Sequence, residues 1–133
     1  MFKVNFYVCP KCGNVTMSTT DAEVRCCGRK LEPEYEGVSQ GTRAEISGNE
    51  YVVSVGHPMQ PDHYFSFLAA VGERGVQFVK LHPGQKAEAR FIMDGVEKIY
   101  TYCTVHGLFA KALKYRSVSN PPGPWAPSPA TTV

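Results

Sequence analysis

From residue 51 onward, the hydrophobic positions fall into short runs rich in β-branched and aromatic residues, separated by glycine or proline. Runs of this length and composition are typical of β-strands. The expected strands cover residues 51–55, 63–68, 76–81, 87–92 and 96–102, with a last strand from 109 to about 116. Short turns such as His82-Pro83-Gly84 and Asp94-Gly95 favour antiparallel pairing over parallel strands joined by helices. We therefore predict a mostly β fold built on an antiparallel sandwich.

The hydrophobic pattern is different at both ends of the chain. Residues 1–36 contain four cysteines and several charges with little apolar periodicity, so this segment needs a metal ion to fold. Residues 37–48 are polar and are expected to form a linker or loop. Residues 117–133 are too proline-rich to enter a sheet. The predicted division is a metal domain at 1–36, a sandwich at 37–116 and a tail at 117–133.

Composition limits the class of protein. A chain of 133 residues with 43% hydrophobic content can form one ordinary core and a small accessory unit. Its net charge of +2, from 14 basic and 12 acidic residues, gives no reason to expect nucleic acid or an anionic membrane as a partner. No apolar stretch of signal-peptide length precedes Cys9, and no run of about 18 apolar residues occurs. We expect a soluble, cytoplasmic protein.

Four of the five cysteines have the spacing of a metal site. Cys9 and Cys12 are separated by two residues, and Gly13 permits the tight turn that lets both thiolates bind one ion. Cys26 and Cys27 supply the second pair, because adjacent cysteines with Cα atoms about 3.8 Å apart are too close for an ordinary disulfide. Zinc and iron both accept four thiolates. A closed set of four ligands predicts structural support or electron transfer.

The remaining cysteine and three of the four histidines lie at expected strand ends. These residues are His57, His63, Cys103 and His106. Hairpin ends at one rim of a sandwich can bring such side chains together, and imidazole with one thiolate suits iron, copper or zinc. We predict a second metal site from these four residues and expect His82, which lies in a turn, at the surface.

These motifs, taken together, carry a resemblance to a known family. They are Cys9-x-x-Cys12 with Cys26-Cys27-Gly28, His57-Pro58-Met59 with His63-Tyr64, Leu81-His82-Pro83-Gly84, and Cys103-x-x-His106-Gly107-Leu108. The combination resembles desulfoferrodoxin, the two-iron superoxide reductase. The resemblance implies a desulforedoxin-like N-terminal domain with a rubredoxin-type iron. It also implies a neelaredoxin-like domain with an immunoglobulin-like fold, and a homodimer.

The resemblance also implies a function for the second site. A ferrous iron would be held by His57, His63 and His106 in a plane and by Cys103 as the axial thiolate, and these four residues would form the catalytic site. One-electron reduction of superoxide would yield hydrogen peroxide. The implied partners are superoxide and an electron donor such as a rubredoxin.

One stretch departs from the family pattern. The family carries a fourth histidine and a lysine before the first sandwich strand, whereas residues 36–50 contain neither residue type. Arg43 could supply the positive charge, and Glu45, Asn49, Glu50 or water could fill the vacant metal position. We expect a reductase that is impaired by this loss.

Two other classes of protein fit part of the pattern. A copper electron carrier could use His57, Cys103 and His106, but it would need an axial methionine after His106, and Met59 lies before the site instead. A binding or electron-transfer module stabilised by zinc or iron would use both sites without reductase activity.

Overall fold

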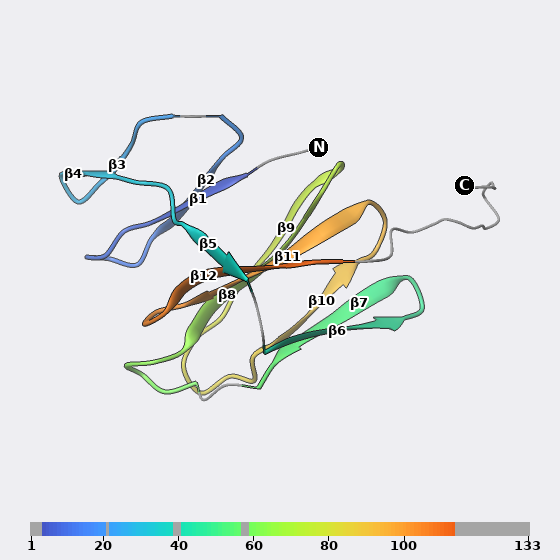
Figure 1. Ribbon diagram of the computed structural model, residues 1–133. Helices are drawn as coiled ribbons and strands as arrows, with labels where there is room; N and C mark the ends of the chain where they lie inside the picture. The colour runs from blue at the N-terminus through green and yellow to red at the C-terminus, as the bar shows by residue number, and fades with distance from the viewer. Residues whose placement is uncertain (1–3, 21, 39–40, 57–58, 114–133) are drawn as a thin grey trace.

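The structure is a computed structural model that describes residues 4–20, 22–38, 41–56 and 59–113. Within these residues the chain forms twelve β-strands and no helix, which confirms the predicted mostly β fold (Figure 1). The strands are β1 Asn5–Val8, β2 Val15–Ser18, β3 Val24–Cys26, β4 Arg29–Leu31, β5 Glu36–Val38, β6 Thr42–Ser47, β7 Glu50–Val55, β8 Phe65–Gly72, β9 Gly75–Lys80, β10 Glu88–Ile92, β11 Val96–Cys103 and β12 Gly107–Ala112. The described part of the chain therefore contains no helix that could cross a membrane.

Two sheets pack face to face to form a sandwich. One has the strand order β10-β7-β6, and the other has the order β5-β12-β11-β8-β9. All their strand pairs are antiparallel except β5 with β12, which is parallel. Tyr51 and Val53 of β7 and Phe91 of β10 meet Leu68 and Ile99 of the larger sheet in one buried cluster. The alternation of buried and exposed positions along β7 and β10 follows from this one-sided burial.

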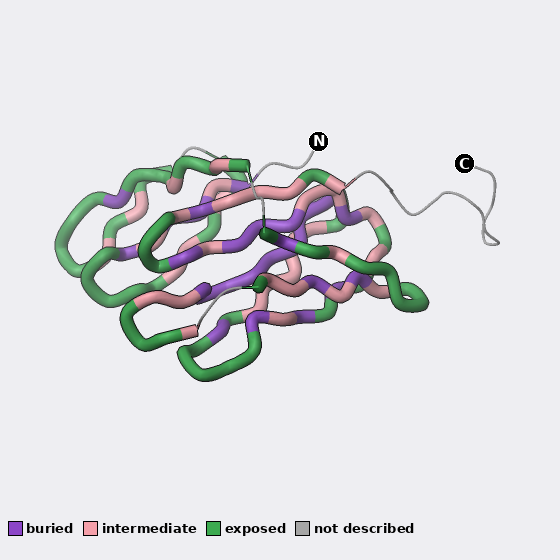
Figure 2. The backbone as a smooth tube through the Cα atoms, turned by 60° about the horizontal axis from the view of Figure 1, so that its bottom comes forward, coloured by how far each residue is buried: buried purple, intermediate pink, exposed green. Residues whose placement is uncertain are grey.

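Strand β8 is buried at every position, because both of its faces are covered (Figure 2). Leu68 and Ala70 face the smaller sheet, whereas Phe67 and Ala69 belong to a second cluster on the opposite face. A strand that is covered on both sides reads as a continuous apolar run, which is why this segment has the clearest strand signal in the sequence.

The N-terminal hairpin covers the outer face of the larger sheet. Strands β1 and β2 pair with each other, and Phe6 of β1 is only 1% exposed. The ring of Phe6 lies 5.3 Å from that of Phe67 and 5.0 Å from that of Tyr100, measured between centroids. Phe6 is therefore buried by docking on the sandwich. Tyr7, the next residue of β1, forms a small separate cluster with Cys9 and Leu31.

In its described part, the polar segment at residues 37–48 forms strands, so the expectation of a linker or loop is wrong there. It contributes the end of β5, which pairs with β12, and all of β6, which pairs with β7. The turn between β6 and β7 contains Gly48 with a φ of +64°. Because β6 lies at the sheet edge and buries only Thr42, its sequence lacks the apolar alternation of an inner strand.

The five other expected strands are confirmed as β7 to β11, with ends shifted by a few residues. The last expected strand is confirmed as β12, which ends at Ala112 in the described part of the chain. Residues 114–116 and the proline-rich tail at 117–133 lie outside the described residues.

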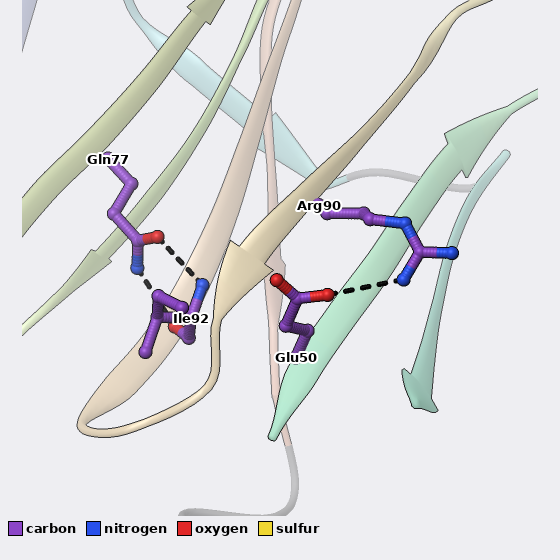
Figure 3. A network of polar contacts seen from close by, with 4 residues as sticks. All are labelled: Glu50, Gln77, Arg90 and Ile92. Carbon is purple, nitrogen blue, oxygen red and sulfur yellow. Dashed lines mark hydrogen bonds and ion pairs between the residues drawn. The ribbon is translucent and has the colours of Figure 1, made fainter. Parts of the chain in front are cut away.

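A side-chain clamp joins the two sheets at one edge of the sandwich (Figure 3). The Gln77 amide of β9 donates to the backbone oxygen of Ile92 in β10 at 2.8 Å, and the Ile92 backbone N–H donates to Gln77 Oε1 at 2.8 Å. Beside it, Arg90 pairs with Glu50 of the neighbouring strand at 3.2 Å. These contacts fix β10, and with it β7, against the larger sheet.

Candidate metal centres

The four N-terminal cysteines gather their sulfur atoms in one place. The Sγ atoms of Cys9, Cys12, Cys26 and Cys27 all lie within 4.8 Å of one another, and none of these cysteines forms a disulfide. The Sγ atom of Cys26 lies 3.5 Å from that of Cys12 and 3.9 Å from that of Cys27. A tetrahedral ion with metal–sulfur bonds of about 2.3 Å requires sulfur atoms about 3.8 Å apart. The set therefore fits a four-thiolate ion.

Tight turns place both pairs of cysteines. The N–H of Gly13 donates to the carbonyl oxygen of Cys9 at 2.9 Å, and Gly13 has a φ of +77°. Strands β3 and β4 pair Cys26 with Arg29, so Cys27 and Gly28 form a two-residue hairpin turn with φ values of +53° and +79°. A positive φ at the non-glycine residue Cys27 is unfavourable, and such backbone strain is typical of functional sites.

Hydrogen bonds shift the pKa values of these thiols in opposite directions. The backbone N–H of Cys12 donates to the sulfur of Cys9 and is the main cause that lowers the pKa of Cys9 to about 6. Hydrogen bonding with the Cys12 sulfur is the main cause that raises the pKa of Cys26 to about 12. A cation would replace the protons that the sulfur atoms share, so metal binding at this site should release protons.

The second site forms where β8 begins and β11 ends. The antiparallel register pairs Phe65, the first residue of β8, with Cys103, the last residue of β11. The N–H of Thr104 donates to the carbonyl oxygen of Tyr64 at 2.9 Å, which holds the segment before β8 against the turn after β11. His63 lies just before β8, and this pairing brings it to the turn after β11.

His63, Cys103 and His106 converge in this region. Their ligand atoms all lie within 4.8 Å of one another. The rings of His63 and His106 have centroids 5.0 Å apart at an interplanar angle of 62°. Cys103 is fully buried, His63 is half-buried and His106 is exposed, so the set has one buried and one open side. Two imidazoles and a thiolate that can reach one ion are a donor set for iron, copper or zinc.

His57, the fourth residue predicted for this site, lies outside the described residues. Gly56, the residue before His57, lines a cavity of about 400 Å³, and Cys103 and His106 line the same cavity. Phe65 and the hydroxyl-bearing Thr42 and Thr101 also line this cavity. Neither threonine was singled out in the sequence, although Thr101 lies two residues before Cys103 and therefore on the same face of its strand.

Comparison with known proteins shows the family of this chain. A family model described as Desulfoferrodoxin matches residues 40–112, which is more than half of the chain. The chain belongs to the desulfoferrodoxin family. Desulfoferrodoxin of Nitratidesulfovibrio vulgaris is 32% identical over 114 residues, which cover 76% of this chain and 90% of the relative. A desulfoferrodoxin homolog of Archaeoglobus fulgidus is 28% identical over 115 residues, covering 77% of this chain and 92% of the relative.

The fold also matches that of a solved structure. The superoxide reductase from Treponema pallidum matches with a TM-score of 0.74 and 22% identity, covering 83% of this chain and 98% of that structure. The match extends beyond the part of the chain that the desulfoferrodoxin family model covers, since 83% of the chain is more than residues 40–112.

Two of the residues suggested for the metal position that the sequence predicts to be vacant, Asn49 and Glu50, lie at the wrong end of the sandwich. Asn49 and Glu50 flank the turn between β6 and β7, whereas Val55, at the other end of β7, lines the cavity beside Cys103. At about 3.4 Å per residue, Glu50 lies about 17 Å from Val55. Glu50 is also paired with Arg90 at 3.2 Å. These two candidates are therefore wrong.

The charged residues of β6 are turned to solvent. Arg43 pairs with Glu45 at 2.9 Å, and their side chains are 74% and 65% exposed. Only Thr42 of this strand is buried, and it lines the cavity. The Arg43–Glu45 pair therefore offers the site little positive charge, because each charge is largely offset by its neighbour.

Met59 and His82 belong to neither ligand group that the described residues form. The sulfur of Met59 accepts the backbone N–H of Phe65 at 3.4 Å, and the side chain packs on the main core. This contact disfavours a copper site that uses Met59 as its axial ligand. His82 is exposed as expected, and its backbone N–H donates to Gln85 Oε1 at 2.6 Å.

Proposed function

We propose that this protein is a non-haem iron protein that reduces superoxide by one electron to hydrogen peroxide. The observation that carries the proposal is the convergence of His63, Cys103 and His106 at one rim of the sandwich. We add His57 to this ligand set from its place in the family motif. Membership of the desulfoferrodoxin family and the fold shared with a superoxide reductase support the choice of iron and of superoxide.

Ferrous iron, when bound by this set, supplies the one electron that the reaction needs. Superoxide takes up that electron and two protons from solvent and leaves as hydrogen peroxide, so no oxygen is formed. Cys103 holds its sulfur in a fully buried position, where a thiolate is kept from solvent, whereas His106 lies on the exposed side by which a small anion can enter.

The four-cysteine site has a separate role in this proposal. Residues 1–36 form a desulforedoxin-like unit whose ion, iron or zinc, is held by Cys9, Cys12, Cys26 and Cys27. Residues 37–116 form the superoxide-reductase-like sandwich. With iron in the first site, electrons from a donor such as a rubredoxin could pass through it. We further propose a homodimer in the cytoplasm, with no nucleic acid or membrane as a partner.

We also propose that the reductase is weakened. Residues 36–50 contain no histidine and no lysine, so neither a fourth imidazole nor a lysine comes from this segment. Arg43, the cation of β6, is paired with Glu45. A missing imidazole changes the electron density that the ligands give to the metal, and weaker positive charge slows the approach of an anion.

The stoichiometry of the reaction tests the proposal. Iron-loaded, pre-reduced protein is mixed with superoxide, and peroxide and oxygen are measured together. Reduction yields one peroxide for each superoxide and no oxygen, whereas dismutation yields one peroxide and one oxygen for every two superoxides. Failure of the pre-reduced protein to consume superoxide would contradict the proposal and favour a metal-stabilised binding or electron-transfer module.

A further inference from the structure

The cavity beside Cys103 and His106 is far larger than superoxide needs. Its volume is about 400 Å³, whereas one water takes up about 30 Å³ in the liquid. Val55, Phe65 and Phe109 provide much of its apolar wall. Among the described lining residues there is no lysine, arginine, aspartate or glutamate. A ligand that fills the space beside this wall is ring-sized and apolar over most of its surface, because a charged group turned to the wall would find no partner there.

The hydroxyl of Thr101 is the polar feature that marks this cavity as a binding site. Thr101 is only 1% exposed and lines the cavity. Within the described part of the chain its hydroxyl has no hydrogen-bond partner, whereas the hydroxyl of Thr104 accepts the N–H of Tyr64 at 3.3 Å. A buried hydroxyl without a partner is unfavourable, so a ligand that bonds to it would gain affinity.

We propose that the cavity binds a neutral azole, of which imidazole is the simplest. One ring nitrogen would complete the metal ligand set beside Cys103 and His106, and the ring N–H would donate to the Thr101 hydroxyl. The azole supplies the kind of donor that residues 36–50 lack. This inference rests on the proposed function, because it requires a metal bound through Cys103.

The first test is a titration of imidazole into the iron-loaded, oxidised protein. The readout is the thiolate-to-iron charge-transfer band that depends on Cys103, which should shift with a saturable dependence on imidazole. Thr101→Val keeps the shape of the side chain and removes the hydroxyl, so it should weaken imidazole binding by about fivefold. Thr16→Val, a change of the same kind on β2, should leave the affinity unchanged.

A second pair of variants tests the cavity itself. Gly41 lines the cavity, and a Cβ there would meet no atom within 4 Å, so a larger side chain can be added at the cavity wall. Gly41→Leu should therefore reduce imidazole binding at least as much as Thr101→Val does. Ala112→Leu adds a larger side chain at an exposed position at the other end of β12 and should bind imidazole like the wild type.

The outcomes separate this inference from the proposed function. A Cys103-dependent band that imidazole does not shift would overturn the azole site and leave the iron assignment in place. A shift with the same affinity in wild type, Thr101→Val and Gly41→Leu would also overturn it, because imidazole would then bind elsewhere. Absence of the band before imidazole is added would overturn both.

Discussion

The Sγ atom of Cys103 lies 3.5 Å from Nδ1 of His106, which follows it in the turn between β11 and β12. One strand end thus supplies two donors of different kinds, a buried sulfur and an exposed imidazole. The turn is closed by the pairing of Cys103 with Gly107, which has a φ of +96°. Two of the three described donors of this site therefore come from the single turn at residues 103–106.

Replacing Cys103 by serine should abolish the thiolate-to-iron charge-transfer band and lower iron content at the C-terminal site. The reason is that Cys103 provides the only sulfur in this described ligand set. Visible spectroscopy and metal analysis of the reconstituted variant measure both effects. His82→Ala, which removes an exposed histidine, is the control and should keep the band. A band that persists in Cys103→Ser would place the sulfur ligand elsewhere.

Replacing Cys27 by serine should remove the N-terminal ion, because three thiolates no longer close the site. Amide protection should fall in β3 and β4, which form the hairpin that carries Cys26 and Cys27. Hydrogen exchange and metal analysis test this together. The Cys103-dependent band should be unaffected. Full metal content with unchanged N-terminal protection would show that the four-thiolate assignment is wrong.

Replacing Phe6 by alanine should lower the free energy of unfolding by about 3–5 kcal/mol, the usual cost of removing a fully buried phenylalanine. The ring is packed between Phe67 and Tyr100 and is 1% exposed. Denaturant unfolding measures the change. Met17→Ala on the paired strand removes a side chain that is 41% exposed, and the change should be within about 0.5 kcal/mol. Equal effects of the two variants would mean that β1 does not dock on the sheet.

Stability should decrease above pH 10 through Tyr100. Burial, followed by the hydrogen bond to Glu36 at 3.0 Å and the charge of Glu36, raises the pKa of Tyr100 in the folded protein. The folded state then holds the proton more tightly than the unfolded state, so this stabilisation is complete below pH 10 and is lost as pH rises above it. The slope from one tyrosine is at most about 1.4 kcal/mol per pH unit.

Denaturant unfolding between pH 8 and 11 measures this slope. Tyr100→Phe should flatten it, and the remaining slope should include Tyr102, whose pKa burial raises to about 12. Tyr35→Phe, at a side chain that is 91% exposed, should follow the wild-type curve. An unchanged slope in Tyr100→Phe would contradict the assignment.

The sequence predicted the parts of the fold whose residues carry a strong local pattern. The apolar run at β8 and the alternation along β7 identify strands because burial on two faces or on one face determines which residues are tolerated. The cysteine spacing likewise predicted a cluster that the structure brings together, as did the positions of His63, Cys103 and His106 at strand ends.

Other features depend on partners that are distant in the sequence. Strand β5 exists because β12 lies beside it, and Phe6 is buried because Phe67 and Tyr100 are there to receive it. Neither has a local signal. In the sequence, Thr101 resembles any other threonine of a strand. Only the structure shows that this buried residue lines a cavity. His57 lies outside the described residues, so its part in the site remains a prediction.

Stopped-flow mixing of the ferrous protein with superoxide tests the central claim most directly. Wild type, His106→Ala and Gly41→His are compared, the last because it places an imidazole beside the cavity. We expect wild-type iron to be oxidised faster than in His106→Ala by a factor on the order of ten or more, and faster still in Gly41→His. Wild-type oxidation no faster than that of His106→Ala would contradict the assignment of this site as a superoxide reductase.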